Sequence, residues 1–130
     1  MFSKNINLIR LGLEHAGGTL KSLDAAGVNI VAGTDSPIFP YGLALIIELQ
    51  NYVDAGLSPS AALRTATSNA ATAMGAGDEI GRLASGMLAD LVIVDGDPLT
   101  RITDLLQVQG VMVNGRYRQL DELLTPVAAD

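Results

Sequence analysis

The chain has 130 residues, 48% of them hydrophobic, so it has enough apolar material for a folded core. Eight basic and fourteen acidic residues give a formal net charge of -6, and the absence of any Lys/Arg-rich run argues against a nucleic-acid partner. No apolar stretch approaches the ~20 residues that a bilayer-spanning helix needs, so no membrane partner is expected.

The chain contains no Cys and a single His, His15. Disulfides, thiolate metal sites and a Cys nucleophile are therefore excluded, and a metal site formed by this chain alone is short of ligands. We interpret His15, which precedes a Gly-Gly pair, as a surface or helix-end residue and not as a metal ligand.

The first elements form a helix-strand unit. Residues 1–17 are expected to be partly helical, with a break at Gly17-Gly18 and a second short helix that Thr19 caps and Gly27 ends. Residues 28–32 (VNIVA) are a short apolar run, which predicts a strand buried on both faces.

Asp35 follows this predicted strand directly. A strand buried on both faces is typical of a parallel sheet covered by helices, and in barrels of this kind the side chains just past the strand's carboxyl end line the active site. Asp35 is therefore a candidate functional residue. The alternative is that it only caps the Ser36-Pro37 turn.

A proline-punctuated loop and two helices come next. Phe39 and Tyr41 lie in the loop and are candidate substrate-binding residues. The apolar pattern predicts a helix over 43–55 that places Glu48 away from its apolar face. Ser58-Pro59 supplies a cap and a first-turn proline, which predicts a single helix over 59–74.

The second half of the chain is expected to be rich in β-structure. The predicted elements are a strand at 89–94, a helical turn at 102–106, strands at 107–113 and 116–120, and a short helix start with a loose tail at 121–130. Asn114-Gly115 between two strands is a strong hairpin signal. Asp90, Asp95 and Asp97 are interpreted as turn residues, because their spacing lacks the later bidentate Glu of a calcium loop.

The order of several short motifs resembles the C-terminal part of the metal-dependent amidohydrolase superfamily. The motifs are AGTDSP at 32–37, GLSP at 56–59, AALRTAT at 61–67, NAA at 69–71, IGRL at 80–83, GMLADLVIVDGDP at 86–98 and VMVNGR at 111–116. No single motif is specific, but the combination covers nearly the whole chain after residue 27. Within the superfamily it is most similar to imidazolonepropionase-like and dipeptidase-like members.

The resemblance implies an α/β fold, namely the C-terminal portion of a TIM barrel together with strands of a small β-sandwich (composite) domain. Residues 1–77 would belong to the barrel, 78–124 to the β-sandwich and 125–130 to a tail. Because a TIM barrel needs ~250 residues, the resemblance also implies that this chain is a fragment of a longer enzyme.

The activity implied by the resemblance is hydrolysis of carbon-nitrogen bonds in non-peptide amides, cyclic amides or dipeptides by a metal-activated water. Asp35 corresponds to the carboxylate that binds a divalent metal, commonly zinc, and passes the proton of the water to the leaving nitrogen. Asp35 is thus both the implied metal ligand and the implied catalytic residue.

The chain departs from the family pattern in its missing metal ligands. The His-x-His pair after the first barrel strand, the ligand of the fourth strand and the His residues of the fifth and sixth have no counterparts here. We therefore expect the chain alone to hold no metal and to be inactive. Two hypotheses stay open: part of a small-molecule hydrolase that is active only with its missing N-terminal portion, or a non-catalytic folded remnant that self-associates.

Overall fold

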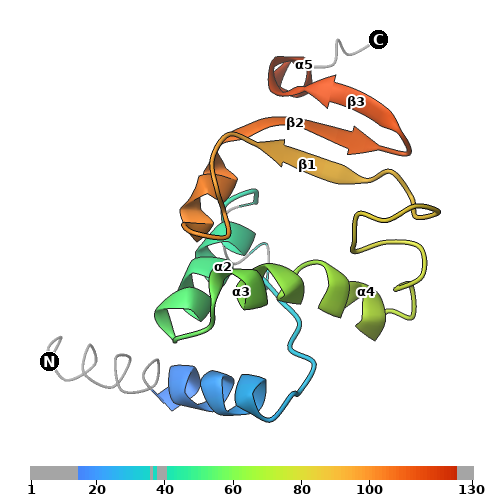
Figure 1. Cartoon of the computed structure of the whole chain (residues 1–130). Coiled ribbons are helices and arrows are strands. Elements are labelled where there is room, and N and C mark those ends of the chain that lie inside the picture. The colour runs from blue at the N-terminus through green and yellow to red at the C-terminus, as the bar shows by residue number, and fades with distance from the viewer. Residues whose placement is uncertain (1–14, 36, 38–40, 126–130) are drawn as a thin grey trace, which may run out of the picture.

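The structure is a computed structural model that describes residues 15–35, 37 and 41–125. Its first described helix occupies residues 15–25. The later elements are α2 (Ala44–Asp54), α3 (Pro59–Thr65), α4 (Ser68–Ala73), β1 (Leu91–Val94), the 3₁₀ helix η1 (Ile102–Leu106), β2 (Val108–Val113), β3 (Arg116–Gln119) and α5 (Leu120–Leu124). The helices α2, α3 and α4 lie together, and the three strands form a separate small sheet (Figure 1). In the described ranges, no helix has the length and apolar character to cross a bilayer.

The first described helix runs through Gly17 and Gly18, so the predicted break at these residues is wrong. A glycine in a helix interior costs about 1 kcal/mol relative to Ala, a penalty that does not by itself end a helix. The hydroxyl of Thr19 does not cap a new helix but donates to the carbonyl of His15 (3.0 Å), one turn earlier in the same helix.

Residues 28–35 have no regular secondary structure, so the strand predicted over 28–32 is not formed. The helix before them ends as predicted at Gly27, whose φ is +72°. Val28 and Val31, expected to be buried, are 49% and 40% exposed. A strand exists through hydrogen bonds to neighbouring strands, and the three strands of the described sheet are β1, β2 and β3. The segment is held instead by hydrogen bonds to backbone and side-chain groups of helices α2, α3 and α4, as shown below.

Helix α2 confirms the helix predicted over 43–55 and supplies the centre of the core. Leu49 is only 2% exposed and packs with Ala62 of α3 and Ile102 of η1, both of which are also buried. Because Ile102 comes from the second half of the chain, one small core joins the helices to the segment that leads into β2.

The helix predicted over 59–74 is two helices in the structure. Its start is confirmed, because the Ser58 Oγ accepts a hydrogen bond from the Ala61 N–H (3.1 Å). Thr67, between α3 and α4, has non-helical dihedral angles (φ -126°, ψ -100°). Its hydroxyl donates to the Leu63 carbonyl (2.8 Å). The Thr67 N–H donates to the carbonyl of Arg64 (3.2 Å), three residues earlier instead of four, so α3 closes in a tightened turn and the regular helical pattern is interrupted.

The sheet is antiparallel with strand order β1-β2-β3. The predicted hairpin between β2 and β3 is confirmed, with Asn114 and Gly115 at φ +50° and +74°. Two successive positive φ values are what a type I′ turn requires, and its twist matches that of the flanking strands. Met112 therefore pairs with Tyr117 across the hairpin.

Two of the three aspartates that were interpreted as turn residues, Asp90 and Asp97, accept hydrogen bonds in the structure. The carboxylate of Asp97 accepts hydrogen bonds from the Leu99 N–H (3.0 Å) and the Thr100 hydroxyl (2.7 Å). Asp90 accepts from the Asn114 N–H (2.6 Å) and so ties the chain before β1 to the hairpin turn. The local bonds of Asp97 confirm its interpretation as a turn residue, whereas Asp90 makes a long-range bond and does not itself lie in a turn.

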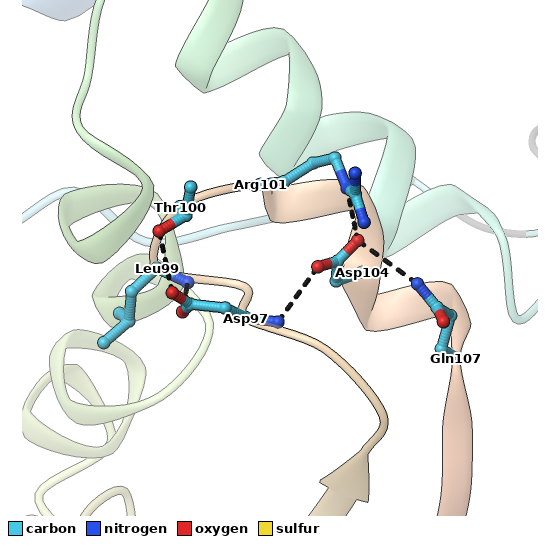
Figure 2. A network of polar contacts seen from close by, with 6 residues as sticks. All are labelled: Asp97, Leu99, Thr100, Arg101, Asp104 and Gln107. Atoms are coloured by element: carbon cyan, nitrogen blue, oxygen red, sulfur yellow. Dashed lines mark hydrogen bonds and ion pairs between the residues drawn. The ribbon is translucent and has the colours of Figure 1, made fainter.

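Asp104, in η1, is a buried carboxylate with several donors (Figure 2). It is 4% exposed and accepts hydrogen bonds from the Asp97 N–H (2.9 Å), Arg101 Nε (2.5 Å) and Gln107 Nε2 (3.2 Å). The Arg101 hydrogen bond, followed by the Asp97 backbone bond, holds the pKa of the Asp104 carboxyl below its usual range. This carboxylate therefore joins the loop after β1 to η1.

We expect the free energy of unfolding to decrease as the pH is lowered through the range in which Asp104 takes up a proton. Its pKa is lower in the folded than in the unfolded chain, so its contribution is present above its ordinary value of 3.8 and is lost as pH falls through the lower folded value. Asp104→Asn should weaken this acid dependence in urea titrations repeated from pH 6 downwards. The matched control is Asp78→Asn, which removes one negative charge at an exposed position outside this hydrogen-bond network.

Candidate active site around Asp35

Asp35 lies between the irregular segment 28–34 and helix α2, and it is exposed. Its backbone is left-handed, with φ +51°. A positive φ is uncommon outside glycine, although Asp tolerates it better than most residues. Such conformations persist where surrounding contacts enforce them, and they cluster at functional sites.

The segment that leads to Asp35 is held from α3 and α4. The Ala32 N–H donates to the Thr65 carbonyl at the end of α3 (3.1 Å). The side chain of Asn69, on α4, donates through Nδ2 to the Ile30 carbonyl (3.0 Å). The backbone carbonyl of Asn69 accepts a hydrogen bond from Asn29 Nδ2 (3.2 Å). These three bonds replace the strand ladder that the sequence predicted.

Glu48 of α2 holds the last part of the same segment. Its Oε1 accepts hydrogen bonds from the Gly33 N–H (2.8 Å) and from the Tyr52 hydroxyl. Burial, followed by the hydrogen bond to Glu48 and its charge, raises the pKa of the Tyr52 hydroxyl well above its usual range. Glu48 therefore contacts the chain two positions before Asp35, and Tyr52, one turn later on α2, supports Glu48.

Sequence reasoning missed Glu48, because the apolar pattern of α2 placed it away from the core-facing side. In the structure its Oε2 atom is buried, and among the described residues it has no hydrogen-bond donor. The available signal was the spacing of Glu48 and Tyr52, which puts a carboxylate and a phenol one turn apart on the same side of a helix.

The two predicted substrate-binding residues are not brought to Asp35 by any described contact. Tyr41 is 79% exposed. Phe39 lies outside the described residues. The assignment of both residues to substrate binding stays a prediction.

The described residues do not by themselves fit a metal ion. Across residues 15–35, 37 and 41–125, no three His, Cys, Asp or Glu side chains come together. A zinc site normally takes three or four protein ligands, and Asp35 contributes one carboxylate. Any metal bound through Asp35 therefore needs further ligands from outside these residues.

A mixed helix and strand fold, with an acidic residue directly after a segment held by helices, agrees with the family indicated by the motifs. Residues 15–118 match the model of the Amidohydrolase family, and the chain belongs to that family.

Individual relatives agree with this membership. A 5-methylthioadenosine/S-adenosylhomocysteine deaminase from Acetivibrio thermocellus is 38% identical over 80 residues, covering 55% of this chain and 19% of the deaminase. The structure of molinate hydrolase has a TM-score of 0.70 at 32% identity, covering 79% of this chain and 26% of that one. A Xaa-Pro dipeptidase has a TM-score of 0.73 at 30% identity, covering 79% and 25%. The chain thus spans about a fifth of the curated relative and about a quarter of each solved structure.

Proposed function

We propose that these residues are part of a hydrolase that acts on carbon-nitrogen bonds, with Asp35 as its acidic site residue. The family match supports the reaction class, and the similar proteins include a deaminase and a dipeptidase. The observation that carries the assignment of Asp35 is its left-handed backbone directly after a segment that three helices hold. A carboxylate in such a place can accept a proton or bind a cation.

The proposed architecture assigns residues 1–77 to the last part of a TIM barrel, 78–124 to a small β-sandwich domain and 125–130 to a tail. In support, helices α2 to α4 precede residue 77, while β1, β2 and β3 follow it. The core contact of Leu49 with Ile102 would then join the two domains. The missing neighbours of the segment 28–32 would be barrel strands supplied by the rest of the enzyme.

The proposed enzyme depends on a divalent metal, with zinc our expectation, and Asp35 as one of the ligands. Because the described residues hold no cluster of ligands around Asp35, the others would come from the missing portion. The substrates proposed are small molecules with a non-peptide amide, cyclic amide or dipeptide bond.

The alternative is that the chain is a folded module without catalysis, which associates with itself. Many large apolar side chains are exposed in the described structure, among them Leu83 (78%), Leu124 (73%) and Val92 (59%). The outer edges of β1 and β3 are also unpaired within the described sheet. Unpaired edges and apolar patches favour association between chains.

The test combines metal analysis, size and activity of the purified 130-residue chain. We expect clearly less than one zinc per chain, no turnover of dipeptides or N-acyl amino acids, and a dimer or larger species by light scattering. Stoichiometric zinc with turnover would contradict the proposed inactivity of the chain alone. The hydrolase proposal predicts an in-frame His-x-His motif in the coding region before Met1, and its absence would favour the non-catalytic module.

A further inference from the structure

We propose that Glu48 is a positioning residue that holds the backbone leading to Asp35 and so sets the direction of the Asp35 carboxylate. This inference rests on the proposed function of Asp35. The described hydrogen bonds of Glu48 go to Gly33 and Tyr52 and not to Asp35, and in our proposal Glu48 does not contact the substrate. It acts through the Gly33 N–H, two residues before Asp35.

The first step is the geometry of the hydrogen bond. Glu48 Oε1 lies 2.8 Å from the Gly33 nitrogen, within the range of a charge-assisted bond. Ala32 next to it is bonded to Thr65 on α3, so consecutive peptide groups are held by two different helices. With both N–H groups held, the chain has little freedom before it enters the left-handed conformation of Asp35.

The second step is the support of Glu48 by its own helix. The Tyr52 hydroxyl donates to the same Oε1 atom, which keeps the carboxylate in one orientation. Tyr52 packs against the buried core cluster, and Leu49, next to Glu48 along α2, is one of its members. The position of the carboxylate is therefore set by packing as well as by hydrogen bonding.

The third step is that packing alone does not account for a carboxylate here. Glu48 Oε2 is buried without a hydrogen-bond donor among the described residues. Burying such an oxygen is unfavourable, whereas an apolar side chain of similar size carries no such penalty. The cost of burying Oε2 is offset by the two hydrogen bonds that Oε1 accepts, from the Gly33 N–H and the Tyr52 hydroxyl.

The test is amide hydrogen exchange of the ¹⁵N-labelled full chain, measured by NMR without metal or substrate. In Glu48→Ala, exchange at Gly33 should rise about tenfold more than at Ala62 of the core, because a local hydrogen bond is lost. Glu48→Gln keeps an acceptor oxygen and should restore most of the protection. In Glu48→Ala, Asp35 should also lose the strong amide-to-α-proton NOE that a positive φ gives.

The matched control is Gln50→Ala, which removes a side-chain bond within α2, from Gln50 to Asp54 (2.7 Å), that does not reach residues 28–35. It should leave Gly33 exchange unchanged. If Glu48→Ala raises exchange at Gly33 and Ala62 equally, Glu48 only stabilises the fold and the proposal is overturned.

Should Glu48→Ala not fold, Tyr52→Phe decides the question. It should raise Gly33 exchange by a smaller factor, since Glu48 loses its support, and an unchanged rate would overturn the proposal. Because exchange and the NOE are measured without turnover, they separate this inference from the proposed function. The two proposals can therefore fail independently. The Glu48 contact can be present even if the parent enzyme has no hydrolase activity, and it can be absent even if the parent enzyme is active.

Discussion

Leu49→Ala is expected to lower the free energy of unfolding by about 2–5 kcal/mol, the range measured for large-to-small changes at buried positions. Leu49 is 2% exposed, and the side chains around it come from α3 and η1 as well as from α2. The cavity would therefore weaken contacts among three elements. Urea unfolding followed by circular dichroism measures the loss.

The matched control is Leu45→Ala, one helical turn earlier on α2. It deletes the same atoms, but Leu45 is 40% exposed. Its cost should stay below about 1 kcal/mol, because little apolar area is returned to water. Equal losses for the two variants would contradict the placement of Leu49 at the centre of the core.

The Leu49 variant also bears on the candidate site. Glu48 precedes Leu49 directly, and the site segment depends on Glu48 through the Gly33 N–H. A loosened α2 should therefore raise Gly33 exchange together with that of core amides. This joint rise differs from the selective rise expected for Glu48→Ala.

Gly81→Ala should be the other strongly destabilising change, costing about 2–5 kcal/mol from left-handed strain and overpacking together. Gly81 has φ +90°. A Cβ added there would lie 2.7 Å from the Cβ of Ala71 and 3.0 Å from the Thr67 carbonyl oxygen. The chain after α4 thus passes close against the joint between α3 and α4. Thermal and urea unfolding measure the cost.

Gly86 provides a matched control for Gly81, because it has the same φ of +90° but open space where a Cβ would be added. Gly86→Ala should cost only the left-handed strain, about 1–2 kcal/mol. Adding Ala71→Gly to Gly81→Ala should recover part of the difference. If the two single variants are equally destabilised, the close contact at Gly81 does not exist in solution.

The sequence by itself determined the features that depend on a few adjacent residues. Ser58 caps α3, Gly27 ends the first described helix, and Asn114-Gly115 makes the hairpin turn, all as predicted. Each of these signals acts through the backbone conformation of its own residue or through a hydrogen bond a few residues away. The order of the motifs was enough to indicate the family, and Asp35 was indicated by its place in one of them.

Only the tertiary structure decided how the segment before Asp35 is held. The pattern of residues 28–32 predicted a buried strand, but pairing depends on neighbours distant in sequence, and here Thr65, Asn69 and Glu48 supply the contacts. An exposed charge on a helix is the ordinary expectation for a Glu. The buried Oε2 atom of Glu48 is a tertiary feature, because it depends on α2 lying against the chain that leads to Asp35. Hydrophobic periodicity indicates which face of a helix is apolar, but not what packs against its other side.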